Sequence, residues 1–480
     1  MFGDWEAVIG LEVHAQLLTR TKLFCGCAVE FGDPPNTHTC PVCLGLPGAL
    51  PVPNEAAIRM GVMAALALGC TLEQKSIFAR KNYFYPDLPK GYQISQYEVP
   101  FCHDGKLEID TPSGKKVARI RRIHFEEDAG KNIHSDSGES IVDLNRAGTP
   151  LVEIVGEPDL RSGEEASEYL KRLREVLMAL GVCDGNLEQG SFRCDANVSV
   201  RKRGTTELGT RTELKNINSF KFVGDAITVE AKRQIAAIES GQALRMQTRG
   251  YTPDKRETYA LRDKEGDAGY RYFPDPDLPP LVLQEAIVSS ARERLPELPE
   301  AKRARYVGLG ITDAAAQVLT GHPAISSAFD AAVTRAQQTG IVDPVKVANF
   351  FQAEVLRDVT TAGLDAAMPI SADQLVEILE LVAESKISGK QAKDVYAKVA
   401  RTERSPRELV AAEGIAVVGD TAAIEAVVRD VIAQSPKQLA QFKAGKTALL
   451  GYFVGQVMKA TKGSADPALV NEILARLLAE

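Results

Sequence analysis

The segment from residue 119 to residue 159 constrains the fold of this chain most strongly. A basic strand is expected over residues 118–123, followed by the acidic triplet EED at 126–128 and a polar loop. The short apolar run LVEIV then carries one carboxylate, Glu153, in its middle. A charge within a buried strand is costly unless a cation or hydrogen bonds compensate it. The pattern therefore predicts a compensated polar site built on strands.

The charged residues of this segment have two interpretations. Arg121, Arg122 and Lys131 lie close to the acids in the sequence, and the mixture indicates a site for metal and phosphate. For the acidic triplet alone, a solvated hairpin with ordinary surface ion pairs is the better explanation. Glu153, inside its apolar run, favours the site.

A second strand pattern places an acid beside a histidine. Residues 7–17, AVIGLEVHAQL, alternate between two sets of positions, which predicts a strand with one buried face. Glu12 and His14 fall on the other face, where an acid and an imidazole can share a divalent cation. The alternative is a polar, solvent-facing strand with a hydrogen-bonded histidine.

Two close cysteine pairs lie in a loop that is rich in glycine and proline. Cys25 and Cys27 form one pair, and Cys40 and Cys43 form the other, which is typical of a tetrahedral zinc site. Four cysteine ligands leave no open position, so zinc in the loop 25–43 would be structural. The alternative is four free thiols. The remaining cysteines are expected to be packing residues, namely Cys70, Cys102, Cys183 and Cys194.

The loop at residues 80–96, RKNYFYPDLPKGYQISQ, combines basic and aromatic side chains with two prolines. Such a mixture suits phosphate binding and stacking on a base or on the end of an acceptor strand. On composition alone, a packed aromatic loop explains it equally well.

Helices and strands alternate in the N-terminal part of the chain. Helical patterns occur over residues 54–68, 163–180 and 226–239, and strand-rich segments are expected over 190–200 and 213–223. Polar residues concentrate in the two strand-rich segments: Arg193, Asp195, Asn197, Glu213, Lys215 and Asn218.

Strand signals almost disappear beyond the prolines at 296 and 299. Apolar residues recur at helical spacing over 345–355, 373–382, 389–399, 421–432 and 446–458. The fold expected is a multidomain α+β protein. It would comprise a mixed α/β domain over residues 1–295, a helical domain over 296–405 and a small helical tail domain over 406–480.

The tail carries a local concentration of positive charge. The net charge of the chain is −7, so contact with nucleic acid requires such a local patch. No acid occurs between Asp430 and Asp466, which favours RNA binding, whereas the alternative, a solvated helix face, usually interleaves acids. The basic residues in this gap are Lys437, Lys443, Lys446, Lys459 and Lys462.

The composition is that of an ordinary globular protein, with 44% hydrophobic and 25% charged residues. No apolar run approaches the ~20 residues of a membrane span. The first residues lack the basic start and apolar core of a signal peptide. A cytoplasmic location is therefore expected.

A series of long motifs extends from the first strand to the last helices. They are AVIGLEVHAQL, RKNYFYPDLPKGYQISQ, HFEEDAGK, VDLNRAGTPLVEIV, FRCDANVSV, ELKNINSF, YRYFPDPDLPPL and GYFVGQVMKATKG. In content and order they resemble the B subunit of the aspartyl/glutamyl-tRNA amidotransferase. The resemblance implies a cradle domain with an ATP-dependent kinase site, a helical domain and a tRNA-binding tail. It also implies two partners, the amidase or A subunit, and the small C subunit.

The resemblance further implies roles for individual residues. Glu12, His14, Glu127 and Glu153 map to the ligands of the catalytic Mg²⁺, and Asp195 and Glu213 are candidates for a second cation. The four cysteines fit the zinc-bearing members of the family. Candidates for phosphate or acceptor-end contacts are Lys81, Lys90, Arg121 and Arg122. Further candidate contacts for ATP are Tyr83, Tyr85, Tyr92, Gln93, Lys131 and Asn197.

The implied reaction has two steps. ATP phosphorylates the side-chain carboxylate of glutamate on tRNA(Gln) or aspartate on tRNA(Asn), and ammonia from the amidase partner then gives the amide. One alternative is a ligase that acts on a free small carboxylate, which would not need the cationic tail. The other is a non-catalytic, zinc-containing RNA-binding scaffold, which would not need Glu153 in an apolar strand.

Overall fold

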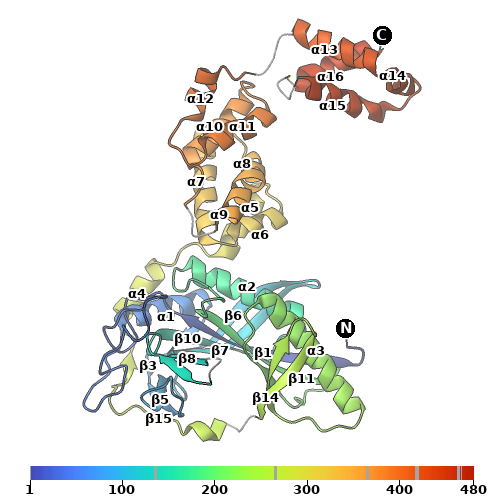
Figure 1. Ribbon diagram of the computed structural model, residues 1–480. Coiled ribbons are helices and arrows are strands. Elements are labelled where there is room, and N and C mark those ends of the chain that lie inside the picture. The colour runs from blue at the N-terminus through green and yellow to red at the C-terminus, as the bar shows by residue number, and fades with distance from the viewer. Residues whose placement is uncertain are drawn as a thin grey trace. The chain divides into compact units, whose positions relative to one another are not determined.

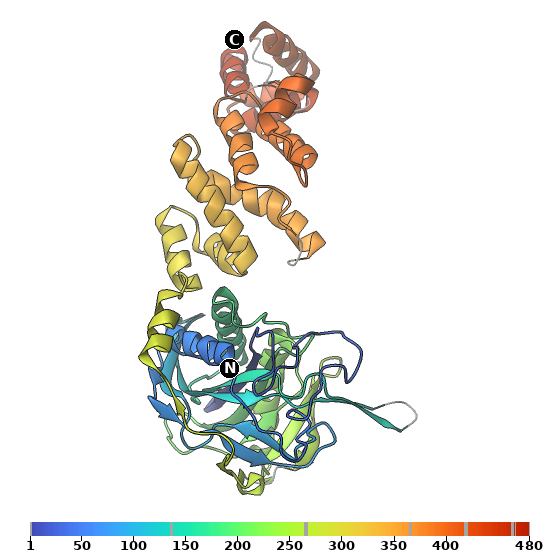
Figure 2. The same ribbon diagram turned by 90° about the vertical axis from the view of Figure 1, so that its left-hand side faces the viewer.

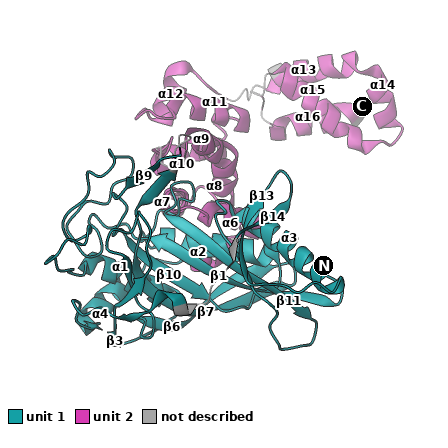
Figure 3. Ribbon diagram, turned by 60° about the horizontal axis from the view of Figure 1, so that its bottom comes forward, with its two compact units in different colours: residues 1–299 teal, residues 300–480 magenta. Residues whose placement is uncertain are grey.

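The computed structural model describes residues 2–134, 138–263, 267–363, 367–416, 421–461, 465 and 467–479. The chain divides into two compact units, residues 1–299 and residues 300–480 (Figure 3). Strands and helices are mixed in the first unit, whereas every named element in the described part of the second is helical. This confirms the expected multidomain α+β class.

A nine-stranded sheet forms the centre of the first unit. Adjacent strands run antiparallel except β12 and β13, which run parallel. In spatial order the strands are β14 (Glu257–Asp263), β13 (Gln247–Thr252), β12 (Thr212–Leu214), β11 (Phe192–Lys202), β1 (Trp5–Gln16), β10 (Pro150–Gly156), β7 (Gly114–Glu127), β6 (Cys102–Thr111) and β2 (Thr71–Leu72).

The alternation predicted for the first strand is confirmed in β1. Ile9, Leu11 and Val13 are at most 1% exposed and belong to the main hydrophobic core. Glu12 and His14 therefore lie on the opposite face of the sheet, because successive side chains of a strand alternate. All four cysteines expected to be packing residues are buried in this unit.

Three helices pack against the core face: α1 (Glu55–Ala67), α2 (Gly163–Ala179) and α3 (Phe220–Glu239) (Figures 1 and 2). α2 contacts β6, and α3 contacts β11. The helices α2 and α3 approach closely, because a Cβ atom at Gly163 would lie 2.1 Å from the carbonyl oxygen of Gly224. Glycine at this position therefore permits the two helices to touch.

Capping side chains mark two predicted helix starts. The Asn54 side chain accepts a hydrogen bond from the Ala56 amide (2.9 Å), and the Ser162 hydroxyl accepts one from the Glu165 amide (3.1 Å). Both bonds satisfy N–H groups that have no partner within the helix. The helices predicted over 54–68 and 163–180 are confirmed.

The strand-rich prediction over residues 213–223 is wrong in its second half. Only the end of β12 lies there, and α3 begins at Phe220 rather than at the predicted residue 226. Val223, Ala226 and Ile227 are buried at helical spacing, so the apolar residues of this segment form a helix face. A four-residue apolar run does not distinguish a strand from the first turn of a helix.

The segment predicted as a rigid loop at residues 80–96 is a short hairpin. β4 (Ala79–Asn82) pairs with β5 (Tyr92–Ser95), and β15 (Phe273–Pro274) pairs with the other edge of β4. Both prolines lie in the connection between the strands. The remaining elements of this unit are β3 (Lys75–Ser76) paired with β16 (Leu281–Val282), β8 (Lys131–His134) paired with β9 (Ser140–Asp143), the 3₁₀ turn η1 (Asp267–Tyr270) and α4 (Glu285–Glu293).

The second unit contains two separate clusters of buried apolar side chains. One extends from Tyr306 to Val410, and the other from Ile424 to Leu478. They divide close to the predicted boundary at residue 405, although the boundaries at 295 and 405 themselves stay predictions. Among the described residues, no helix has both the length and the apolar character of a membrane span.

The helices predicted over 373–382, 389–399 and 421–432 are confirmed, and that over 446–458 starts later, at Leu450. The elements are α5 (Pro299–Gly308), α6 (Asp313–Thr320), α7 (Pro323–Thr339), α8 (Pro344–Phe350), the π-helical turn η2 (Phe351–Val355), α9 (Leu356–Ala362), α10 (Ala372–Ala383), α11 (Gly389–Val399), α12 (Pro406–Glu413), α13 (Thr421–Gln434), α14 (Pro436–Lys443), the 3₁₀ turn η3 (Thr447–Leu449), α15 (Leu450–Ala460) and α16 (Pro467–Ala479).

Candidate functional site

Polar side chains from three adjacent strands meet on the face of the sheet opposite the core. The register pairs His14 of β1 with Glu153 of β10, and Glu153 with His124 of β7. Paired residues of neighbouring strands project to the same side, so the three side chains lie next to one another. Glu126, two residues beyond His124, shares this face.

The cluster formed by His14, Glu126 and Glu153 has the dimensions of a cation site. The Nε2 atom of His14 lies 3.3 Å from Oε2 of Glu153 and 4.0 Å from Oε2 of Glu126. One ligand atom from each residue lies within 4.8 Å of the other two. Two carboxylates and one imidazole are ligands that hold a divalent cation. We call this group the sheet cluster.

His124 was not identified from the sequence, although it lies beside the sheet cluster. Its Nε2 atom is 3.4 Å from Oε1 of Glu126 and 3.3 Å from Oε2 of Glu153. The side chain is almost completely buried. Strand alternation is the sequence signal that could have identified it. His124 and Glu126 are two residues apart, so they lie on the same face of the strand.

Burial and charge act in opposite directions on these groups. Burial favours the neutral form of Glu153, yet His124 and His14 hold its pKa well below the usual value. Burial likewise opposes protonation of His124, but Glu153 and Glu126 raise its pKa to about 9. For Glu126, the nearby Lys81 ammonium outweighs burial and lowers the pKa. The acids are therefore held in the ionised form that a cation requires.

The structure does not bring the four predicted Mg²⁺ ligands together. Glu127 lies on the opposite face of β7 from Glu126, because adjacent residues of a strand alternate. Its Oε1 atom accepts a hydrogen bond from the Ile94 amide (2.9 Å) and pairs with the Lys90 ammonium. Glu126, rather than the expected Glu127, lies in the sheet cluster.

Glu12 belongs to a second group of acids on the same face. Glu12, Asp195 and Glu213 have carboxylate oxygens within 4.8 Å of one another. The Lys215 ammonium already lies among them, 2.5 Å from Oδ2 of Asp195 and 3.5 Å from Oε1 of Glu213. Asn197 donates to Glu12 (2.9 Å). This group, the lysine cluster, is thus partly neutralised by the chain itself.

Two of the contacts predicted for residues 80–96 lie beside the Glu126 carboxylate. The Lys81 ammonium is 3.9 Å from Oε1 of Glu126, whereas Gln93 donates to Oε2 of Glu126 (3.3 Å). Tyr83 donates to Gln93 (3.3 Å), and Tyr85 is 52% exposed. Lys81 therefore faces the sheet cluster, and Tyr85 is accessible at its edge of the hairpin.

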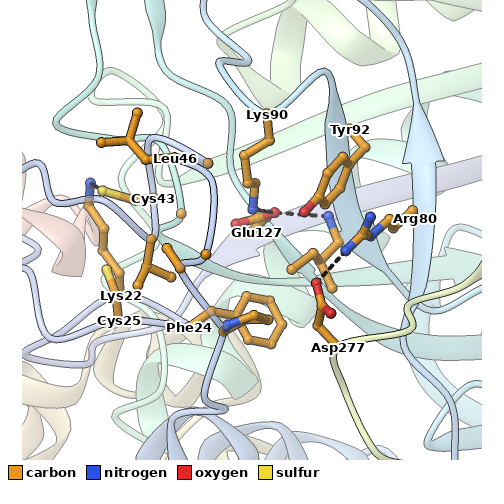
Figure 4. A pocket seen from close by; sticks show the side chains of 17 residues that line it. Lys22, Phe24, Cys25, Cys43, Leu46, Arg80, Lys90, Tyr92, Glu127 and Asp277 are labelled. Carbon is orange, nitrogen blue, oxygen red and sulfur yellow. Dashed lines mark hydrogen bonds and ion pairs between the residues drawn. The ribbon is translucent and has the colours of Figure 1, made fainter.

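Lys90 and Tyr92 line a separate pocket of about 200 Å³ between the hairpin and the cysteine loop (Figure 4). The Tyr92 ring lies between the Arg80 guanidinium, at 4.2 Å, and the Lys90 ammonium, at 5.3 Å. Arg80 is also bonded to Asp277 (2.8 Å), so its charge is compensated. Glu127 forms part of this pocket rather than of the sheet cluster.

Three further predicted basic contacts have other partners in the structure or face solvent. Arg121 donates to both carboxylate oxygens of Glu157, at 2.9 and 3.0 Å. Arg122 donates to the Tyr97 carbonyl (2.9 Å), and Lys131 is exposed on β8. Arg122 nevertheless lies on the same face of β7 as His124 and Glu126, because these residues follow one another at two-residue spacing. Arg121 lines a different pocket, together with Glu12 and Asn197.

The four cysteines of the loop 25–43 converge. Their sulfur atoms lie within 4.8 Å of one another, and those of Cys40 and Cys43 are 3.9 Å apart. A tetrahedral shell with Zn–S bonds of about 2.3 Å separates its sulfurs by about 3.8 Å, so the spacing fits zinc. The pKa of Cys43 is lowered by a hydrogen bond from the Cys25 thiol, by one from the Cys40 amide, and by the charge of the Lys22 ammonium. A lowered pKa favours the thiolate form of Cys43.

The described tail lysines are all exposed. Lys437 and Lys443 lie on α14, Lys446 precedes η3, and Lys459 lies on α15. Lys462 lies outside the described residues. The positive charge predicted from the sequence is therefore accessible to a polyanion.

The fold and the two acidic clusters define a class: a protein with a carboxylate–histidine cluster on a mixed sheet, followed by helical domains. Comparison with family models narrows the class. Residues 7–289 match the "GatB/GatE catalytic domain", and residues 329–478 match the "GatB domain". The chain belongs to the family formed by the B subunits of aspartyl/glutamyl-tRNA(Asn/Gln) amidotransferases.

Curated relatives with that name are similar over their full length. The relative from Anaeromyxobacter dehalogenans (strain 2CP-1) is 52% identical, with 100% of this chain and 99% of the relative covered. Those from Geotalea uraniireducens and Myxococcus xanthus are 50% and 49% identical, with at least 99% of both chains covered. The family indicated by the sequence motifs is thereby confirmed.

Proposed function

We propose that this chain is the B subunit of a tRNA-dependent amidotransferase, a carbon–nitrogen ligase that uses glutamine as amido donor. Its substrate would be Glu-tRNA(Gln), Asp-tRNA(Asn) or both. ATP would phosphorylate the side-chain carboxylate, and ammonia from the amidase partner, the A subunit, would convert the acyl phosphate into the amide. The small C subunit would complete the assembly. The names of the relatives support this assignment.

The sheet cluster is the observation that carries the proposal. His14, Glu126 and Glu153 would hold Mg²⁺, which supplies charge neutralisation for the phosphates of ATP. The lysine cluster is the weaker candidate, since Lys215 already compensates its acids. We therefore revise the predicted ligand set, with Glu126 in place of Glu127 and with Glu12 in the lysine cluster.

Lys81 is the best placed cation for a phosphate of the substrate. Burial opposes its protonation, but Glu126 and neighbouring groups raise the pKa of Lys81 above its usual value, so it stays charged. Phosphoryl transfer depends mainly on alignment and charge stabilisation, which a fixed ammonium supplies. Lys90 is held by Glu127, and it would act from the adjacent pocket on the acceptor end or the nucleotide.

Two further assignments complete the proposal. The cysteines of the loop 25–43 would bind one structural zinc ion, because their spacing fits a closed tetrahedral shell. The exposed lysines of α14 and α15 would contact the tRNA backbone, since they are free of interleaved acids. Neither assignment requires these residues to take part in the chemistry.

ATP hydrolysis by the reconstituted heterotrimer tests the proposal. The expected result is turnover that depends on Glu-tRNA(Gln) or Asp-tRNA(Asn) and stays near background with the same tRNA uncharged. Equal turnover with a free small carboxylate would favour a ligase that does not use tRNA. Absence of ATP turnover with every charged tRNA, despite tRNA binding, would favour the RNA-binding scaffold.

A further inference from the structure

His124 lies between the two acids of the sheet cluster, yet no role has been assigned to it. It comes from β7, and its register partner Glu153 comes from β10. Its Nε2 atom is 3.4 Å from Glu126 Oε1 and 3.3 Å from Glu153 Oε2. With 2% of its surface exposed, His124 is a buried bridge between carboxylates of two different strands.

The two ring nitrogens of His124 have different environments. Nδ1 is buried and has no hydrogen-bond partner, whereas Nε2 faces both acids. A bare Nε2 lone pair would repel two carboxylate oxygens, and a proton on Nδ1 alone would be a buried donor without an acceptor. The neutral tautomer that avoids both costs has its proton on Nε2. The imidazolium also has a proton on Nε2, so Nε2 is a donor in either form.

A protonated Nε2 donates to the acids and is not available as a ligand for a cation. Its effect must therefore pass through Glu126 and Glu153. The Ser95 hydroxyl donates to the same oxygen of Glu126 that His124 approaches, at 2.6 Å, while Oε2 of Glu126 is the oxygen nearer to His14. Oε1 of Glu126 is thus anchored by a short hydrogen bond, whereas Oε2 faces His14 and accepts only the longer bond from Gln93 (3.3 Å).

We propose that His124 is a positioning residue. Its Nε2–H group fixes Glu126 and Glu153 relative to each other, so that both acids and His14 converge on one cation. The inference takes the identity of the reaction from the proposed function. The expected effect of His124 on cation binding does not depend on which reaction the site performs. Partners that orient metal ligands in this way typically change affinity by about 10–100-fold when they are removed.

Two amide substitutions separate positioning from simple packing. In His124→Gln, the side-chain amide nitrogen lies about as far from the backbone as the imidazole Nε2. In His124→Asn it lies one methylene closer to the backbone, at about the position of Nδ1, out of reach of the acids. The two variants have the same chemistry and differ only in reach, so they are matched controls for each other.

Mn²⁺ binding to the full complex, followed by electron paramagnetic resonance of the free ion, provides a readout separate from activity. The binding step lost in His14→Ala identifies the sheet cluster. We expect His124→Asn to weaken that step by at least about tenfold. We expect His124→Gln to stay within about threefold of the wild type, with both variants melting within a few degrees of it.

Equal Mn²⁺ affinity for the wild type, His124→Gln and His124→Asn would overturn the proposal. It would also be overturned if both variants lost affinity in proportion to lost folding, because that is the signature of a packing role. If His124→Asn does not fold, His124→Met replaces it, with the length of Gln and no N–H group.

Failure of the proposed function has a different signature. A wild-type complex that binds Mn²⁺ at the cluster but does not amidate charged tRNA would refute the function. The order of affinities among the His124 variants would still decide the positioning role.

Discussion

Glu153 shows at the scale of a single residue how a buried charge becomes a functional signal. The sequence places it in an apolar strand, where an ionised acid needs compensation. The structure provides two imidazoles within 3.3 Å of the same carboxylate oxygen. A cation bound at the sheet cluster would add to this compensation. The same charge that makes Glu153 costly to bury would therefore bind the cation.

The strand face, rather than membership of the acidic triplet, decides which glutamate of β7 serves the cluster. We expect Glu126→Gln to weaken Mn²⁺ binding at the sheet cluster by at least about tenfold, because it removes one ligand charge. Glu127→Gln is the adjacent control, and it should leave cation affinity within about twofold while releasing Lys90. Mn²⁺ titration measures both. A loss of affinity confined to Glu127→Gln would show that the assignment from the strand face is wrong.

At the scale of elements, the cysteine loop is expected to depend on its metal. Metal analysis of the purified chain under reducing conditions should give about one zinc ion per chain. Cys43→Ser should remove the zinc and lower the melting temperature, because a structural zinc ion contributes directly to folding. Cys183→Ser, at a buried cysteine outside the loop, is the control and should retain the metal. Less than half an equivalent of zinc in the wild type would refute the site.

The packing of α3 on the sheet includes a buried acid outside both clusters. Glu230 accepts from Arg233 (2.7 Å) and Thr258 (2.8 Å), and these partners outweigh burial and lower its pKa. An acid whose pKa is lowered on folding stabilises the folded state at pH values above its usual pKa, near 4.5. This stabilisation is lost as the pH falls through the pKa of the acid in the folded protein. We expect Glu230→Gln to lower the melting temperature at pH 7, with a smaller difference at pH 4. If the variant lost the same number of degrees in melting temperature at pH 4 as at pH 7, this expectation would be contradicted.

Period-two alternation predicted much of the fold and of the site, and its limits explain the errors. It placed Glu12 and His14 on one face, whereas Glu153 was singled out by a different signal, a charge within an apolar run. It would also have selected Glu126 rather than Glu127, but the phase of the strand becomes certain only once a register partner is known. The segment 213–223 and the hairpin around Lys90 were misread because short apolar or aromatic runs do not determine their own period.

Contacts between distant segments were beyond prediction. His124 becomes interesting only when β7 lies beside β10, and the pairing of Lys90 with Glu127 depends on how the hairpin folds onto the sheet. The contact of Lys215 with Asp195 likewise depends on the pairing of β11 with β12. Of the expected Mg²⁺ ligands, Glu12 therefore lies with the two acids that were expected to hold a second cation.

At the scale of the whole molecule, the proposed catalytic site and the cationic stretch of the tail belong to different compact units. The sheet cluster belongs to residues 1–299, and the exposed tail lysines belong to residues 300–480. Binding of tRNA by the tail and chemistry at the sheet should therefore respond to different substitutions.

Charge reversal in the tail tests this separation. We expect Lys443→Glu combined with Lys459→Glu to weaken tRNA binding and to reduce the slope of log affinity against log salt by roughly one for each lost contact. Lys171→Glu, an exposed position on α2, is the control and should change neither quantity. Filter binding over a range of salt concentrations measures both. Unchanged affinity in the double variant would remove the tail from the RNA interface.

The most direct test of the central claim is amidation of charged tRNA by a complex that carries Glu153→Gln. This substitution keeps the size of the side chain and removes the charge that the sheet cluster needs. We expect ATP-dependent formation of Gln-tRNA or Asn-tRNA to fall by about two to four decades, with tRNA binding and melting temperature retained. Glu157→Gln, in the exposed pair with Arg121, should amidate normally. A folded Glu153→Gln complex with near-normal amidation would contradict the account.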